Sequence, residues 1–393
     1  MKKPIMAFIM IVLVYATVEA LFYGSEWLLF KRDSSFYSPF QDTNLREDHR
    51  RIIDKMVQGK NEYLVHSGSL GWTIKPDDTQ STKANRQGFR GDREYTEIPP
   101  AGKIRLTTFG DSFTHCDGVS NSEMWQAVLE SLNPKLEVLN FGVPGYGTDQ
   151  AYLRYREDGK SFKTQYVLIG VMSENIRRVV NTYRPFYYSD TGIPLSKPYF
   201  SIEDDQLIAH ENGLYSLSDY QELIKDPQPL LAALGEDDYW HNRKKGQTLW
   251  DLFPSVRMAK RINTKLFDPP NTREPDNIDN EDGSYNREAT PYRVLRKILR
   301  QFYDEALAEG AQPVILFFPD HWAVFHYRKT QTKVYEPLLE ELRENGYVTI
   351  DLMESLAKPE RDEDVEKFFD GHYSPLGNQR VAEQIYSALK DQF

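Results

Sequence analysis

From residue 103 onward, the chain alternates between short apolar runs and longer segments in which apolar residues recur every three or four positions. The short runs have the length of strands, and most are apolar without a break, as expected when both faces are covered. We expect five strands, at residues 103–110, 136–143, 165–171, 313–319 and 347–352. Strands that are separated by helices in this way form a parallel sheet, because each crossover returns the chain to the same edge.

The segments between these runs have helical spacing and recognisable helix boundaries. Ser120 and Glu123 have the spacing of a capping box. Ser374, followed by Pro375, has the pattern of an N-cap and a first helical turn. We expect helices at residues 120–132, 149–161, 290–309 with Thr290 as N-cap, 330–345, and from 375 to the C-terminal region.

Residues 103–393 are therefore expected to form one α/β domain. The fold class is a flavodoxin-like three-layer α/β/α sandwich with a mostly five-stranded parallel sheet. The alternation is interrupted at residues 185–290, which are rich in Tyr, Pro and Asp. We interpret this segment as a large insertion with a hairpin turn at Asp204–Asp205.

The N-terminus has a different pattern. A basic start precedes an uncharged apolar run at residues 4–18, and further apolar residues follow. This pattern predicts a signal-anchor or transmembrane segment over residues 1–30. Two alternatives stay open, namely a secretory signal cleaved at a site that includes Ala20, and a helix buried in a cytosolic protein. Residues 31–102 are expected to form a stalk and an N-terminal extension.

Composition excludes several classes of protein. The net charge of −11 and the lack of a long basic run argue against a nucleic-acid partner, because phosphate binding needs clustered Lys and Arg. The single cysteine, Cys116, rules out an internal disulfide. We expect no cofactor and no metal, since His321 and His326, near Asp320, have a spacing that is poor for one helix face.

Polar residues follow each predicted strand at the point where it ends. The carboxyl ends of parallel strands share one edge of a sheet, where ligands bind in open α/β folds. A serine hydroxyl at such an edge becomes a nucleophile when histidine takes its proton and an acid orients that histidine. Pre-aimed N–H donors stabilise the resulting oxyanion. The residues at these positions are Asp111, Ser112, Asn140, residues 142–148, Ser173, Glu174, Asn175, Asp320, His321, Asp370 and His372.

Four of these segments resemble the sequence blocks of the SGNH (GDSL-type) hydrolases of the membrane-anchored bacterial type. They are "FGDSFT" at 109–114, "NFGVPGYGTDQ" at 140–150, "GVMSENIRR" at 170–178 and "DGHYSPLGNQRVA" at 370–382. Their order matches the family, and the resemblance covers about residues 103–183 and 291–390. The family glycine of the second block lies five residues after the strand-end asparagine, which selects Gly145 over Gly142.

The resemblance implies a role for each site residue. Ser112 is the nucleophile, His372 is the general base, and Asp370 orients the histidine. The N–H groups of Ser112 and Gly145 and the amide of Asn175 form the oxyanion hole. The pattern differs from Gly-x-Ser-x-Gly, so the ordinary α/β-hydrolase class is not favoured.

Two features depart from the family pattern. The third block reads Glu-Asn-Ile around Asn175 where the family has Gly-Asn-Asp. Only Gly371 separates Asp370 from the histidine, where two residues are usual. Asp320 and Asp351 are therefore kept as alternative orienting acids.

Several residues near these blocks have two readings. His115 and Cys116 are interpreted as structural or pocket-lining residues. Trp322 and Tyr327 are candidates for the lining of a sugar pocket. A run of aromatic residues either covers the site as a lid or packs in the core; it comprises Tyr183, Phe186, Tyr187 and Tyr188.

Together these observations predict a serine esterase outside the cytoplasm, at the periplasmic side or cell surface, or secreted if the leader is cleaved. The expected substrate is an acylated carbohydrate or another ester, and the membrane is a partner through the N-terminal segment. An acyltransferase in the membrane is a candidate partner. The alternatives are a polysaccharide O-acetyltransferase, a lipase or lysophospholipase, and a non-catalytic glycan-binding protein on the same fold.

Overall fold

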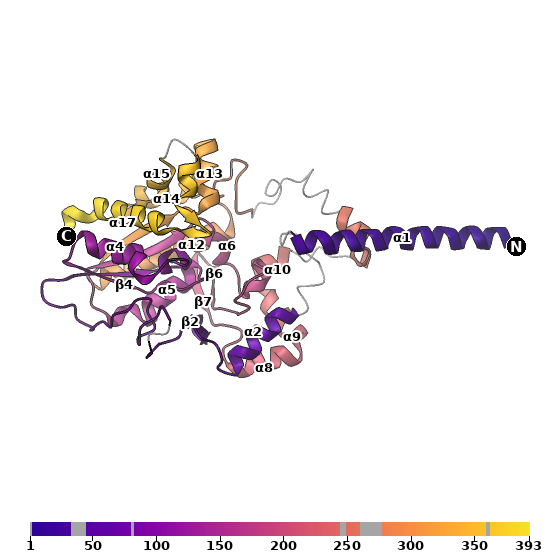
Figure 1. Cartoon of the computed structure of the whole chain (residues 1–393), viewed down its shortest axis with the longest axis horizontal. Helices are drawn as coiled ribbons and strands as arrows, with labels where there is room; N and C mark the ends of the chain where they lie inside the picture. Colours follow the sequence, from indigo (N-terminus) through magenta and orange to yellow (C-terminus); the bar gives the residue numbers. More distant parts are fainter. Residues whose placement is uncertain (1, 33–44, 80–81, 244–248, 260–276, 359–361) are drawn as a thin grey trace.

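The computed structural model describes residues 2–32, 45–79, 82–243, 249–259, 277–358 and 362–393. It contains an α/β domain and a long N-terminal helix, α1 (Lys2–Arg32), which projects away from the domain (Figure 1). Residues 33–44 of the expected stalk lie outside the described residues.

The domain is built on a five-stranded sheet in which all neighbouring strands are parallel. The strands are β3 (Ile104–Phe109), β4 (Leu136–Asn140), β5 (Tyr166–Met172), β8 (Gln312–Phe318) and β9 (Thr349–Asp351). Their order in the sheet is β4-β3-β5-β8-β9. This order confirms the predicted flavodoxin-like parallel sheet. Thr108 of β3 is in register with Asn140 of β4 and Leu168 of β5, so the segments after these strands start at one edge.

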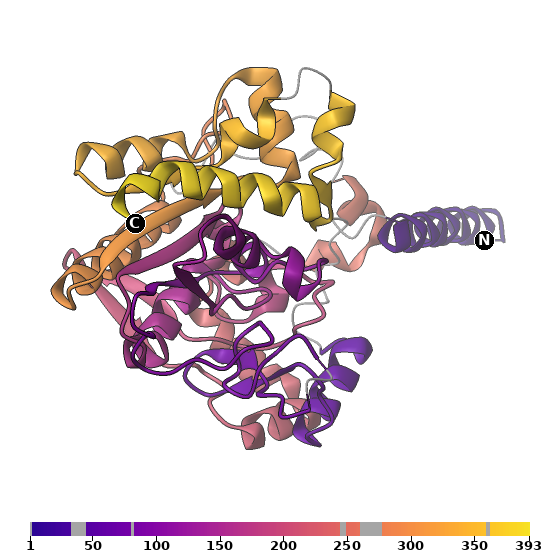
Figure 2. The same cartoon turned by 60° about the vertical axis from the view of Figure 1, so that its left-hand side comes forward.

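Helices cover both faces of the sheet, which confirms the three layers (Figure 2). On one face, α4 (Trp125–Leu132) packs against α17 (Pro375–Leu389). On the other face, α5 (Thr148–Glu157) packs against α12 (Thr290–Ala308), and α14 (Glu336–Glu344) lies beside β9. The predicted cap of α17 is present, because the Ser374 hydroxyl accepts the N–H of Gly377 at 3.2 Å.

Some helix boundaries differ from the prediction. The segment 120–132 is divided at Met124, whose extended backbone separates the 3-10 turn η1 (Asn121–Glu123) from α4. The segment 330–345 lacks a helix at its start, because α13 (His321–Thr330) ends at Gln331 in a left-handed conformation. The N-cap of α12 is Ala289, one residue before the predicted Thr290, which occupies the first helical position.

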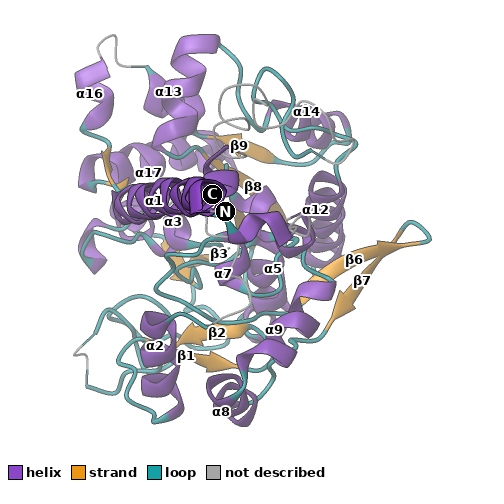
Figure 3. Ribbon diagram, turned by 90° about the vertical axis from the view of Figure 1, so that its right-hand side faces the viewer, coloured by secondary structure: helices purple, strands orange, loops and turns teal. Residues whose placement is uncertain are grey.

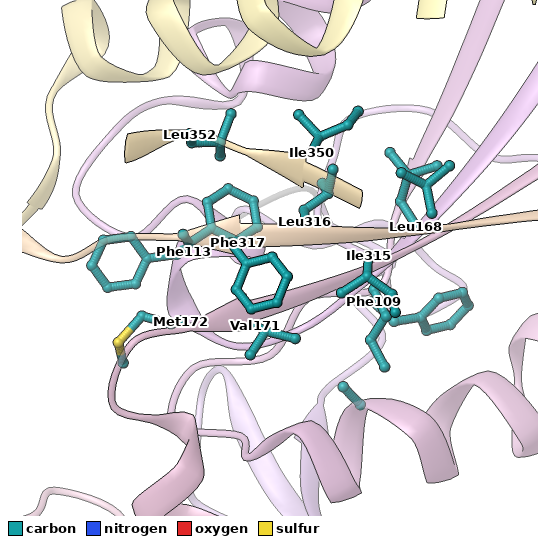
Figure 4. Packing of buried hydrophobic residues seen from close by; sticks show 14 of the residues in the cluster. Phe109, Phe113, Leu168, Val171, Met172, Ile315, Leu316, Phe317, Ile350 and Leu352 are labelled. Carbon is teal, nitrogen blue, oxygen red and sulfur yellow. The ribbon is translucent and has the colours of Figure 1, made fainter. Parts of the chain in front are cut away.

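The first core consists of the buried apolar side chains between the sheet and its helices (Figure 4). Phe109 at the end of β3 stacks on Phe141, with ring centroids 4.7 Å apart. Leu316 in the middle of β8 is 1% exposed. Burial on both faces explains why these strands read as unbroken apolar runs.

A second core lies beside the first and has a different origin. Its buried members come from the N-terminal extension, from the loop after β4, and from residues 183–234: Leu45, Ile53, Met56, Leu70, Trp72, Ile74, Ala84, Val143, Tyr146, Tyr183, Phe186, Leu195, Leu214, Tyr220, Leu223, Leu231 and Leu234. The elements that carry them include α2 (Glu47–Val57), β2 (Gly71–Ile74), which pairs with β1 (Leu64–Ser67), α8 (Leu217–Lys225) and α9 (Pro227–Glu236). The chain from residue 45 onward therefore packs on the insertion, where the sequence suggested a stalk.

The predicted hairpin in the insertion is present and projects from the domain (Figure 3). It consists of β6 (Tyr199–Glu203) and β7 (Gln206–His210). Asp204 and Asp205 form its turn with φ values of 45° and 61°, which short polar side chains tolerate.

The remaining described elements are α3 (Ser112–His115), η2 (Gly159–Ser161), α6 (Asn175–Arg178), α7 (Arg184–Tyr187), α10 (Tyr239–Arg243), η3 (Leu249–Leu252), α15 (Met353–Ala357), α16 (Asp362–Glu366), β10 (Phe369–Asp370), β11 (His372–Tyr373) and η4 (Lys390–Gln392).

The helix α1 is long and apolar enough over Lys3–Leu28 to cross a membrane, and this stretch is not buried inside the structure. The buried-helix alternative is therefore wrong, because the apolar side chains have no protein core around them. By length and composition, α1 suits either a membrane anchor or a secretory signal.

Candidate active site

Ser112 lies where β3 ends, in the first position of the one-turn helix α3. The preceding residue, Asp111, caps this turn, because its Oδ1 accepts the N–H of Phe113 at 2.9 Å. Cys116 ends the helix after one turn in a left-handed conformation with φ of 66°. This strand–turn geometry presents the Ser112 hydroxyl at the carboxyl edge of the sheet.

His372 reaches the same edge from the other end of the chain. Its Nε2 lies 2.9 Å from the Ser112 Oγ, although the two residues are 260 positions apart. The neighbouring residue Tyr373 anchors this segment through two hydrogen bonds. The Tyr373 hydroxyl donates to the Pro319 carbonyl at 2.7 Å, and the Asn378 side-chain amide donates to the Tyr373 carbonyl at 2.9 Å. The structure therefore brings together the predicted nucleophile and the predicted base.

Asp370 lies directly opposite His372 in the two-residue pairing of β10 with β11, across Gly371 with φ of 69°. Residues opposite each other in antiparallel strands direct their side chains to the same face. Asp370 is exposed, and among the described residues no hydrogen bond or ion pair joins it to His372. Its role as the orienting acid stays a prediction.

The two alternative acids are held elsewhere. Asp320 caps α13, since its Oδ1 accepts the N–H of Ala323 at 2.8 Å. Asp351 accepts the Tyr335 hydroxyl at 2.7 Å and pairs with Lys333 at 2.8 Å. Neither carboxylate is placed to orient His372.

Asp117 is an acid that the sequence reasoning missed. Burial raises the pKa of Asp117, but the hydrogen bond with His115 and the charges of His115 and His372 outweigh it, so the pKa is lowered. The Asp117 N–H donates to the Ser112 carbonyl at 3.0 Å, which fixes this residue beside the nucleophile. Its position five residues after Ser112 was the only signal in the sequence.

The predicted oxyanion amide, Asn175, lies at the start of α6 beside the nucleophile loop. Its Nδ2 donates to Asp111 Oδ2 at 3.0 Å, and Arg178 donates to the same oxygen at 3.3 Å. An amide nitrogen carries two hydrogens, so Nδ2 keeps a second donor for an oxyanion. Arg178 also pairs with Glu174 at 3.2 Å, which gives the departure in the third block a structural function.

The loop after β4 distinguishes the two candidate glycines. The Gly142 N–H donates to the Asn140 side chain at 2.9 Å, so it is already used inside the loop. Gly145 has φ of 80°, and among the described residues its N–H has no partner. The choice of Gly145 is thus compatible with the hydrogen bonds of this loop.

Residues outside the sheet hold the peptide units around Gly145. The Trp72 indole N–H donates to the Pro144 carbonyl at 2.9 Å. This carbonyl belongs to the same peptide unit as the Gly145 N–H, so the bond orients and polarises that donor. Arg184 donates to the Gly145 carbonyl at 2.6 Å. Both side chains lie outside the four sequence blocks, and no motif indicated them.

His115 connects the nucleophile loop to the N-terminal extension. Its Nε2 accepts the Tyr63 hydroxyl at 2.5 Å, and its Nδ1 pairs with Asp117. Burial lowers the pKa of His115 to about 4, although Asp117 acts in the opposite direction. Arg90 lies beside the same ring and donates to the carbonyls of the adjoining loop at Cys116 and Val119, at 2.7 and 2.6 Å. The structural reading of His115 is supported by these contacts.

The aromatic run after β5 is mainly packing. Tyr183 and Phe186 are buried in the second core. The Tyr187 hydroxyl donates to Glu174, whereas Tyr188 is 48% exposed. Trp322 is also exposed and stacks on His326, with ring centroids 5.1 Å apart. Among the described residues, no group of three His, Cys, Asp or Glu side chains is arranged to hold a metal ion.

No model of a known protein family matches the chain, and no curated protein matches it. Solved structures do match, and their names agree with the resemblance to the GDSL-type hydrolases. A lipolytic protein of the G-D-S-L family from Veillonella parvula is 9% identical, covers 73% of this chain and 98% of its own, and has a TM-score of 0.38. A catalytic mutant of an acetylxylan esterase from Geobacillus stearothermophilus is 10% identical and covers 73% and 95%, with a TM-score of 0.36. A GDSL-like lipase from Bacteroides thetaiotaomicron is 9% identical and covers 75% and 92%, with a TM-score of 0.34.

Proposed function

We propose that the chain is a serine ester hydrolase whose nucleophile is Ser112 and whose general base is His372. The observation that carries this proposal is the 2.9 Å contact between Ser112 Oγ and His372 Nε2 at the carboxyl edge of the sheet. Nε2 accepts the hydroxyl proton only when it is unprotonated, so the neutral ring carries its proton on Nδ1. An acid beside Nδ1 fixes this tautomer, and Asp370 is the predicted one.

The reaction follows from these positions. Ser112 Oγ attacks the acyl carbon while His372 Nε2 takes the hydroxyl proton, and a tetrahedral oxyanion forms. The C–O bond to the alcohol then breaks, and His372 returns the proton to the leaving oxygen. Water attacks the acyl-enzyme by the same two steps, which releases the carboxylic acid and restores Ser112.

The oxyanion in both steps needs donors that are already in place. The Ser112 N–H, the Gly145 N–H and the second hydrogen of Asn175 Nδ2 are the proposed donors. A donor of this kind contributes about 3–4 kcal/mol to the transition state. Trp72 and Arg184 keep the Gly145 peptide in position, so that the loop does not have to rearrange during the reaction.

The proposed substrate is an O-acyl group on a surface or exported carbohydrate. The apolar α1 supports a catalytic domain that is tethered at the outer side of a membrane, with the basic N-terminus inside. Acyl transfer to a second sugar is tested in the same experiment.

The test is covalent labelling of the full chain in detergent with a fluorophosphonate, followed by mass spectrometry of the adduct. We expect the adduct on Ser112 and its loss in His372→Ala, with an exposed serine variant, Ser131→Ala, as the control. Ser112→Ala is expected to lower kcat for p-nitrophenyl acetate by about 10⁴-fold or more. A folded chain that is not labelled at Ser112 would contradict the proposal. Faster hydrolysis of acetyl esters than of long-chain acyl esters distinguishes a carbohydrate esterase from a lipase. Transfer of the acetyl group to an added glycan rather than to water identifies an acetyltransferase.

A further inference from the structure

The helix α1 carries two carboxylates within its apolar stretch, Glu19 and Glu26. At about 1.5 Å per residue from Lys3, they lie about 24 Å and about 35 Å along the helix. With a hydrocarbon core about 30 Å thick and the basic end on the inner side, Glu19 lies in the outer half of a bilayer and Glu26 at its outer surface. A carboxylate at such a depth is costly unless other groups pair with it.

Both carboxylates are paired by one short segment of the insertion. Ser255 donates its backbone N–H to Glu19 at 3.0 Å, and its hydroxyl donates to the other oxygen of the same carboxylate. Arg257 donates from Nε at 3.0 Å and from Nη2 at 2.5 Å to the two oxygens of Glu26. This bidentate pair has the geometry of a strong ion pair. The two acidic positions of α1 are therefore built to receive this segment.

The contact continues along one face of α1. Phe253 meets Tyr15 edge to face, with ring centroids 5.9 Å apart. Residues spaced by four and then seven positions lie on the same side of a helix, so Tyr15, Glu19 and Glu26 form one face. The segment runs along this face.

The same segment exposes large apolar side chains. Trp250 is 69% exposed and Leu252 is 57% exposed, both in the turn η3 next to the contact with α1. Trp is enriched where a membrane meets water, because its ring is apolar and its N–H is polar. The position of these side chains beside the outer half of α1 identifies a lipid surface as their partner.

We propose that residues 249–258 form a membrane-inserted element that docks along α1 from Tyr15 to Glu26 and places Trp250 and Leu252 in the outer half of the lipid bilayer. The proposal rests on membrane anchoring by α1 and not on the ester chemistry. It requires that α1 is retained, because cleavage at Ala20 would remove Tyr15 and Glu19 from the contact. This docking also holds the domain at the membrane by the side on which α10 and α6 lie (Figure 1).

The test measures the depth of a spin label in vesicles of phosphatidylcholine and phosphatidylglycerol that contain the full chain. Leu252→Cys carries the label, and Leu307→Cys at the end of α12 is the matched control, since Leu307 is 48% exposed. The native Cys116 is buried and does not compete for the label. We expect collisions of the Leu252 label with a water-soluble nickel complex to be about fivefold fewer than those of the Leu307 label, with collisions with oxygen increased. Equal accessibility of the two labels would overturn the proposal, as would a purified chain that begins after Ala20.

A second variant tests the docking itself. Arg257→Gln removes the pair with Glu26, and the Leu252 label is expected to become more accessible to the nickel complex. The control is Arg380→Gln, which removes an exposed ion pair on α17. An unchanged Leu252 label in Arg257→Gln would overturn the role of this pair. Fluorophosphonate labelling of the same samples keeps the two proposals apart, because Ser112 is labelled whether or not Leu252 lies in lipid.

Discussion

The first and second cores meet at the loop after β4, but they are built in different ways. The first core joins regular strands and helices whose apolar periodicity is visible in the sequence. The second core joins the N-terminal extension to the insertion, two segments that are far apart in the sequence. Val143 and Tyr146 of the loop belong to the second core, although the loop follows a strand of the first. The first core thus supplies the nucleophile, and the second holds the proposed oxyanion loop.

Truncation of one buried leucine to alanine in each core is expected to give the largest effects and to show whether the two cores unfold separately. Leu316→Ala in β8 removes a side chain that is 1% exposed and should cost about 3–4 kcal/mol of global unfolding free energy. Leu223→Ala in α8 removes one that is 0% exposed, and we expect a similar cost that is confined to the second core. Hydrogen exchange measures both effects. Equal loss of protection in β3 and β5 for the two variants would show that the cores unfold as one unit.

The contact of the extension with the nucleophile loop predicts a pH dependence. Burial lowers the pKa of His115 from 6.5 to about 4, so the folded state keeps the ring neutral while the unfolded state binds a proton below about pH 6.5. Stability should therefore fall as the pH decreases from about 6.5 to about 4, by up to about 3 kcal/mol. Urea unfolding at several pH values measures this slope. The variant His115→Gln should flatten it, and a slope that is unchanged in this variant would assign the effect to other groups.

Asp370, the predicted orienting acid, gives the next largest effect. Asp370→Asn is expected to lower kcat by about 100-fold, because a neutral amide does not stabilise the charged imidazolium as a carboxylate does. The parallel variant Asp117→Asn decides between the two acids near His372. A larger loss of kcat in Asp117→Asn than in Asp370→Asn would move the role to Asp117.

The indole of Trp72 gives the smallest effect and the most specific one. Trp72→Phe keeps an aromatic ring in the second core but removes the donor to Pro144. We expect kcat to fall about tenfold with KM nearly unchanged, because the lost bond supports a donor used in the transition state. The control is Trp240→Phe, whose indole donates to the Arg177 carbonyl at 2.8 Å outside this loop. An equal loss of kcat in both variants would point to general loosening of the second core.

Much of the first core could be predicted because its periodicity is local. The strands, the helices between them that make the sheet parallel, and the N-cap at Ser374 all follow from residues near one another in sequence. The break in the predicted helix at Met124 and the start of α14 at Glu336 rather than at residue 330 could not be predicted, because they depend on which side chains are buried. Among the site residues, Ser112 and His372 were indicated by motifs and meet in the structure.

The sequence by itself determined the alternation of strands and helices that builds the layers and the apolar N-terminal segment, and its resemblance to the SGNH hydrolases indicated Ser112 and His372 as a pair. Hydrophobic spacing and turn residues act over a few positions, so a single chain displays them directly. Only the tertiary structure decided that Trp72 and Arg184 hold the Gly145 loop, that Asp117 lies near His372, and that Ser255 and Arg257 pair with carboxylates of α1. These are contacts between distant and irregular segments, and their partners are chosen by complementary shape and hydrogen bonding after the chain has folded.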